Sequence, residues 1–223
     1  MNKLKHCFAN SLVYITNKVD CHCQLNSPAS VIIHEETDSL IICDYDKKRV
    51  VRWPRQNGIS EETIISSVGC WSSAFDNDGF LYVVDYNNQN VKRYRMGESK
   101  GILAAGGNGE GHGLDRLSYA GHIFVDRDQT VRVPDSNNHR VMKWKKDEKE
   151  GIVVAGGQDK GNSLTQLSSS CGISVCQSGA TQGYVIIFEN TDENHCNSLH
   201  YPAGLSFDRE NNLYVVKYED HQA

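Results

Sequence analysis

A polar cluster stands out in the stretch VPDSNNHRVMKWKK, residues 133–146. Its members are Asp135, Asn138, His139 and Arg140. A carboxylate and an imidazole this close in sequence are residue types that general acid–base catalysis uses. The same frame recurs, however, as ICDYDKKRVVRW at 42–53 and as VVDYNNQNVKRY at 83–94. A constellation that repeats along a chain is typical of architecture rather than of a single active site.

We therefore interpret the cluster as a turn. The Asp carboxylate is expected to accept backbone N–H groups of the following turn, and Asn to take the left-handed conformation that it tolerates. Arg140, or Arg49 in the first copy, is expected to pair locally.

The glycine-rich stretch AGGNGEGHG, residues 105–113, suggests a phosphate loop, because such loops offer backbone N–H groups to anions. No Gly-Lys-Ser/Thr follows it, and its counterpart AGGQDKGNS loses most of the glycines. We predict a connection between repeats.

Four side chains could ligate zinc, with the CHC stretch at 21–23 as a second possibility. They are Cys171, Cys176, Cys196 and His200. Their spacing is irregular, so we predict incidental thiols, no metal site and no cofactor. Nucleophilic catalysis also has no local signature, since no Gly-x-Ser-x-Gly motif occurs.

The elements that must position these residues are repeated strands. Asp44, Asp85 and Asp135 each precede a valine by six residues and an aromatic residue by nine, with repeat lengths of 41 and 50. Each unit contains four short strand patterns separated by Asp, Asn and Gly turns. Four strands per repeat predict the blades of an all-β propeller, in which apolar runs such as LYVV are covered on both faces.

The segments GFLYVVDYNNQNVKRY and VPDSNNHRVMKW resemble NHL repeats, named for an Asn-His-Leu run that Asn138 and His139 match, with Arg140 in the third place. The resemblance covers roughly residues 25–218 and implies an NHL-type propeller, commonly six-bladed in that family.

The copies degrade toward the C-terminal end, so the predicted propeller is incomplete. Three full four-stranded units are expected at about 25–70, 71–119 and 120–170, a degenerate unit at 171–200 without its middle strands, and a truncated unit at 201–218. Residues 1–24 contain one possible strand, SLVYITN, and residues 219–223 form a tail. An open arc leaves sheet faces and edges exposed, so ring closure is expected to need another chain or missing sequence.

The chain has 223 residues and a formal net charge of −5, which argues against adhesion of its whole surface to nucleic acid or anionic membrane. Its longest apolar runs are far shorter than the ~20 residues of a membrane helix. The N-terminal stretch lacks the continuous apolar segment of a signal peptide, so we expect a cytoplasmic location and eight reduced cysteines.

Basic residues recur in the third strand of each unit, and equivalent positions would form a band around the ring. They are Arg49, Arg52, Lys92, Arg93, Arg95, Arg140, Lys143 and Lys145. We weigh a partner or RNA contact against simple solvation of the rim, and favour solvation.

The sequence favours a noncatalytic interaction scaffold with a protein partner. The resemblance adds that the chain is the partner-recognition part of a larger, tripartite-motif-like ubiquitin ligase. Single-stranded RNA binding through the basic residues is one alternative. A metal-dependent propeller lyase or hydrolase is another, although no catalytic signature supports an enzyme.

Overall fold

The computed structural model describes residues 25–55 and 61–157 in full, and the backbone of six further strands. Those strands are β1 (Leu4–Phe8), β2 (Ser11–Ile15), β15 (Ile173–Cys176), β16 (Tyr184–Ile187), β17 (Pro202–Phe207) and β18 (Leu213–Lys217). No helix in this described part is long and apolar enough to cross a bilayer.

The three repeats fold into three four-stranded antiparallel sheets, each with its strands in chain order. The first contains β3 (Pro28–His34), β4 (Ser39–Asp44), β5 (Arg49–Pro54) and β6 (Glu62–Ser66). The second contains β7 (Cys70–Phe75), β8 (Leu81–Asp85), β9 (Asn90–Tyr94) and β10 (Ile102–Gly106). The third contains β11 (Phe124–Val125), β12 (Val131–Asp135), β13 (Arg140–Trp144) and β14 (Ile152–Gly156).

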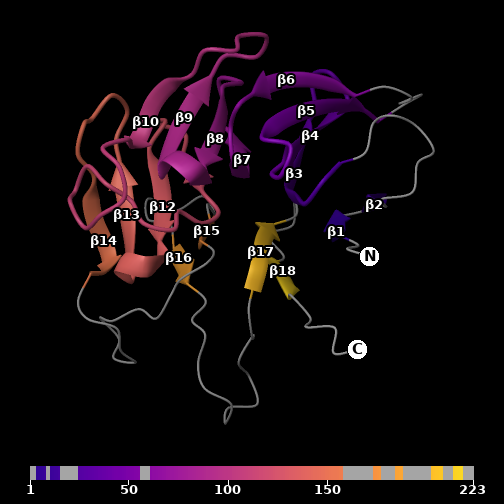
Figure 1. Cartoon of the computed structure of the whole chain (residues 1–223). Helices are drawn as coiled ribbons and strands as arrows, with labels where there is room; N and C mark the ends of the chain where they lie inside the picture. The colour runs from indigo at the N-terminus through magenta and orange to yellow at the C-terminus, as the bar shows by residue number, and fades with distance from the viewer. Residues whose placement is uncertain are drawn as a thin grey trace.

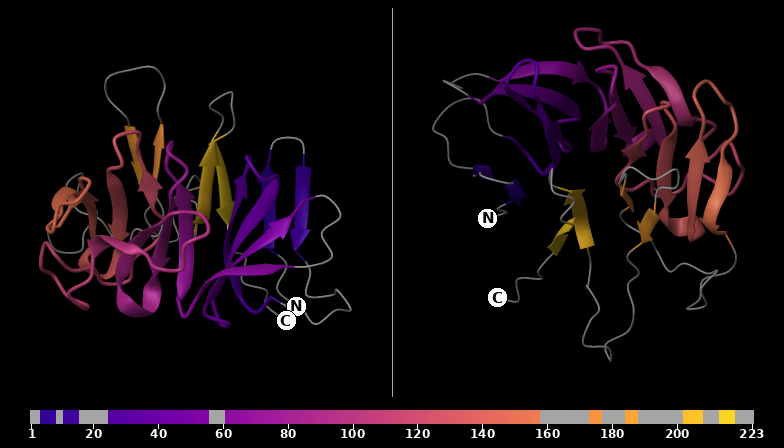
Figure 2. Two further views of the ribbon diagram at one scale, coloured as in Figure 1. Left: turned by 90° about the horizontal axis from the view of Figure 1, so that it is seen from above. Right: turned by 180° about the vertical axis from the view of Figure 1, so that it is seen from behind.

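The remaining described strands form three two-stranded sheets, β1–β2, β15–β16 and β17–β18. Figures 1 and 2 show the sheets following one another around a common centre in chain order, with β1–β2 between β17–β18 and the first four-stranded sheet. This is the predicted all-β propeller with three full blades, one degenerate blade and one truncated blade. The structure places two strands near the N-terminus, where the sequence indicated one.

The core lies between neighbouring blades, because alternate residues of one strand face opposite sides of its sheet. On β8, Leu81 and Val83 pack with Ile41 of the first blade, while Tyr82 and Val84 pack with Met142 of the third. Burying each such side chain stabilises the fold by about 1.5–3 kcal/mol. The continuous apolar run LYVV thus reflects a sheet covered on both faces, as predicted.

A glycine precedes the fourth strand of the second blade and of the third blade, in the similar stretches KGI and EGI. A Cβ at Gly101 would lie 2.6 Å from the ring of Tyr94, and one at Gly151 would lie 2.7 Å from the ring of Trp144. Each glycine lets the backbone lie directly against the aromatic ring that ends the third strand.

A disulfide bond joins Cys43 on β4 to Cys70 on β7, so it links the first and second blades. The prediction that all eight cysteines are reduced is therefore wrong for these two. The residues lie 27 positions apart in sequence, but neighbouring blades bring their Cα atoms to 5.1 Å, within disulfide reach.

Candidate functional site

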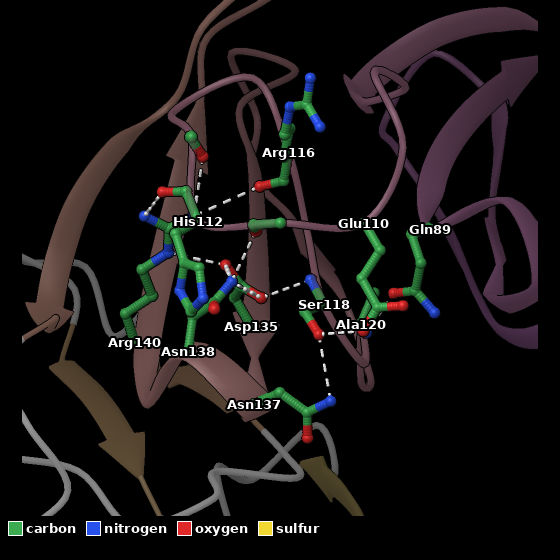
Figure 3. Close-up of polar contacts among 12 residues, drawn as sticks. Gln89, Glu110, His112, Arg116, Ser118, Ala120, Asp135, Asn137, Asn138 and Arg140 are labelled. Carbon is green, nitrogen blue, oxygen red and sulfur yellow. Dashed lines mark hydrogen bonds and ion pairs between the residues drawn. The ribbon is translucent and has the colours of Figure 1, made fainter.

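The cluster that first suggested catalysis is an internal contact in the third blade (Figure 3). Arg140 donates from Nε to Asp135 Oδ2 at 2.6 Å, from Nη1 to His112 O at 2.9 Å, and from Nη2 to Gly113 O at 2.8 Å. Asn138 Nδ2 also donates to Asp135, whose side chain is fully buried. Arg140 therefore ties the third blade to the glycine-rich connection, which joins two blades as predicted.

The first blade repeats this arrangement with Arg49. Its Nε donates to Asp44 Oδ2 at 2.8 Å, and its Nη2 lies 2.7 Å from Glu61 Oε1. Burial lowers the pKa of Arg49, but the hydrogen bonds and charges of Asp44 and Glu61 together outweigh it, so the pKa is raised. The predicted local pairing of Arg49 and Arg140 is confirmed.

Two details of the turn differ from the prediction. The Asp carboxylates accept backbone N–H groups mainly from the residues before the blade: Asn26 N donates to Asp44, and Ser118 N to Asp135. The left-handed residue is not Asn but the last residue of each turn. These residues are Lys48, Gln89 and His139, with φ of 50°, 48° and 49°.

The second blade departs from this pattern at one position. Asp85 pairs across the strands with Asn90, whereas Asp44 and Asp135 pair with Arg49 and Arg140. Asp85 is 1% exposed and accepts from Gly69 N, Asn88 N and Asn88 Nδ2. Among the described residues, no cation forms an ion pair with it.

A polar hollow of about 720 Å³ opens beside this position. Its wall includes Tyr86, Asn90, Lys92, Glu110, Tyr119 and Asn137. The hollow thus lies where the second blade, the connection to the third blade and the η2 turn (Ser136–Asn138) come together.

Hydrogen bonds across the blade boundary hold the rim of the hollow (Figure 3). Gln89 Oε1 of the second blade accepts from Ala120 N at 3.2 Å, and Ser118 Oγ donates to Glu110 Oε1 at 2.6 Å. Asn137 Nδ2 donates to Ser118 Oγ at 3.0 Å. These bonds hold the side chains of Gln89, Glu110 and Asn137 in place at the hollow.

Four aromatic rings lie in contact next to the hollow, and we call them the aromatic row: Tyr45, Trp71, Tyr86 and Tyr119. The centroids are 5.6 Å apart for Tyr45 and Trp71, 5.5 Å for Trp71 and Tyr86, and 5.1 Å for Tyr86 and Tyr119. Burial, followed by the neighbouring Tyr119, raises the pKa of Tyr86 to about 12. Tyr119 is 40% exposed and has a φ of 61°, a conformation unusual for a bulky residue.

The eight basic residues singled out in the sequence have different surroundings. Arg49 and Arg140 form ion pairs with the buried Asp44 and Asp135, and Arg52 forms an ion pair with Glu62. Arg93 donates to Gln129 Oε1 at 2.9 Å and lies over Phe80, as does Arg95. Lys92 lines the hollow, Lys143 is half-buried and Lys145 is exposed. Whether any of them contacts a partner stays a prediction.

The possible zinc ligands Cys171, Cys176, Cys196 and His200, and the CHC stretch at 21–23, lie outside the residues whose side chains the structure describes. Within those residues, no three His, Cys, Asp or Glu side chains gather in a way that could hold a metal.

Sequence reasoning missed the hollow and the aromatic row. The aligned repeats do contain a signal for the first, because Asp-x₄-Arg occurs at 44–49 and 135–140 but Asp-x₄-Asn at 85–90. For the aromatic row the repeats show only that Tyr45 and Tyr86 are equivalent, because each follows the Asp of its repeat. The contacts of Trp71 and Tyr119 with these rings depend on how neighbouring blades pack.

Comparison with protein-family models finds no match, and no curated protein matches the sequence. Solved structures do match. A gluconolactonase from Xanthomonas campestris has a TM-score of 0.61 at 14% identity, over 87% of this chain and 71% of that one.

Two other solved structures that match are not gluconolactonases by name. An auxiliary nutrient binding protein from Bacteroides thetaiotaomicron has a TM-score of 0.63 at 14% identity, over 86% of this chain and 58% of that one. A virginiamycin B lyase from Staphylococcus aureus has a TM-score of 0.58 at 10% identity, over 93% and 67%. At these identities the likeness shows the fold alone, and it is a β-propeller.

Proposed function

We propose that this chain is a noncatalytic, NHL-type propeller that binds a protein partner, as the recognition part of a larger, tripartite-motif-like ubiquitin ligase. The partner binds the face that presents the aromatic row and the hollow. The NHL assignment is supported by the Asn138–His139 match and by the Asp frame of the three repeats.

The aromatic row is the observation that carries the proposal. Tyr and Trp are enriched among the residues that dominate binding energy at protein interfaces, because they bury a large area and still carry a polar group. Three rings of the row are half-buried, Tyr119 is exposed and each ring contacts the next, so the row reaches the surface of the protein. The strained backbone of Tyr119 presents its ring there at a cost of about 1–3 kcal/mol.

The test places the photo-crosslinking residue benzoylphenylalanine at Tyr119, in the full chain expressed in its own cells. We expect a crosslinked protein, identified by mass spectrometry. Its binding to the purified chain should weaken at least about tenfold in Tyr119→Ala, the range of an interface hot spot.

Asn77 provides the control, because it is exposed on the β7–β8 turn, away from the aromatic row. The same crosslinker at Asn77 should not trap this protein, and Asn77→Ala should bind it normally. Equal crosslinking at both positions, or unchanged binding by Tyr119→Ala, contradicts the proposal.

A further inference from the structure

The three full blades offer an internal comparison at one position. In the first and third blades, an arginine of the chain occupies the place opposite the buried Asp, and Arg140 shows how that place binds a guanidinium group. One carboxylate oxygen and the carbonyl oxygens of His112, Gly113 and Arg116 receive its N–H groups. This surrounding of acceptors suits the donor-rich fork of an arginine.

The second blade keeps the carboxylate but lacks the cation. Asn90 stands in the arginine's place, and its shorter side chain ends where a guanidinium would continue. The neighbouring blades have ion pairs whose carboxylates are fully buried, whereas here, among the described residues, N–H groups alone donate to Asp85.

Asn90 is also left with an unused acceptor. It lines the hollow and is 6% exposed, and its Oδ1 accepts no hydrogen bond among the described residues. A buried polar atom without a partner is costly, so such an atom in a binding site points to a ligand that supplies the missing donor.

The charges around the hollow favour a cation over an anion. Glu110 lines the wall and the buried Asp85 lies behind Asn90, whereas Lys92 is the one basic residue among the lining residues. The rings of Tyr86 and Tyr119 add aromatic faces, which attract guanidinium groups.

From these observations we infer that the hollow beside Asn90 binds an arginine side chain of a protein partner, which takes the place that Arg49 and Arg140 fill in the neighbouring blades. The inference rests on the proposed function, because it names the residue type that the partner inserts. Lys92 opposes the incoming charge and so limits the affinity.

The test titrates the ¹⁵N-labelled full chain with acetyl-Gly-Arg-Gly-amide and follows, by NMR, the side-chain amide signals of Asn90 and the backbone amide signals of the residues that line the hollow, which the Asn90 variants keep. Matched peptides carry citrulline, lysine or glutamate in place of arginine. We expect the arginine peptide to shift the Asn90 signal, and the citrulline peptide to bind at least about tenfold more weakly because it lacks the charge.

Two substitutions probe the site from opposite directions. Asn90→Arg fills the place from within and pairs with Asp85, so it should raise the melting temperature and weaken the arginine peptide at least about tenfold. Lys92→Met removes the opposing charge and should strengthen binding by about two- to fivefold. Asn77→Arg adds the same charge to the same blade outside the hollow and should leave binding unchanged.

Asn90→Leu, which has a similar size and no acceptor, replaces Asn90→Arg if the latter does not fold, with the same expected loss. The inference is overturned if citrulline binds as well as arginine, if the glutamate peptide is preferred, if no peptide shifts the signal, or if the Asn90 variants bind normally. Failure of crosslinking at Tyr119 with intact arginine binding would refute the proposed function alone.

Discussion

At the residue scale, the same polar frame has two uses in one molecule. In the first and third blades the Asp and Arg side chains satisfy each other, so the frame stabilises the structure. In the second blade a single replacement, Asn90, leaves an unpaired acceptor beside a hollow. The same Asp-containing motif is therefore structural in the first and third blades and part of a candidate site in the second.

The structural use of the motif predicts a large effect for Arg140→Ala. The substitution leaves Asp135 as a buried carboxylate without its cation, so the free energy of unfolding should fall by about 3–5 kcal/mol. Urea denaturation measures this loss. Arg140→Lys should not restore stability, because an ammonium group cannot reach the carboxylate and the carbonyls together.

Arg52→Ala is the matched control for the Arg140 prediction. Arg52 pairs with Glu62 at the surface, where an ion pair contributes about 0–1 kcal/mol. A loss for Arg140→Ala no larger than the loss for Arg52→Ala would contradict the structural role of Arg140.

At the element scale, the first two blades are held together by buried side chains and by a disulfide bond. Strands β4 and β7 belong to different sheets, and the Cys43–Cys70 disulfide joins them within the apolar cluster between these sheets. The bond therefore joins the first two blades in the folded protein and keeps Cys43 and Cys70 together when the chain unfolds.

Removal of this bond should lower stability. Closing a loop of this length stabilises a protein by about 3–4 kcal/mol, mainly by restricting the unfolded chain. Cys43→Ala/Cys70→Ala should therefore melt below the oxidised wild type, as measured by circular dichroism. Reductant should lower the melting temperature of the wild type toward that of the variant, and equal melting of all samples would contradict the assignment.

At the scale of the whole molecule, the sheets are unequal. Three blades have four strands each, and the other three described sheets have two. Two-stranded sheets are marginal alone, and their unpaired edges bind other strands readily.

We therefore expect the isolated chain to associate through the edges of its two-stranded sheets when no other partner is present. Sedimentation velocity should show species heavier than the 24.9 kDa chain, in proportions that grow with concentration. A compact monomer at every concentration would contradict this expectation.

The sequence by itself determined the repeat, the four-stranded units and their degeneration, because strand periodicity and turn residues are local properties. It also determined that Asp135 and Arg140 form a turn contact. The spacing of these two residues recurs along the sequence, and this recurrence can be recognised without knowing which distant residues they contact. Only the tertiary structure decided that Cys43 meets Cys70, that four aromatic rings form a row, and that Asn90 borders a hollow. Each of these depends on how one blade lies against the next, and local patterns do not contain the distance between side chains of different sheets.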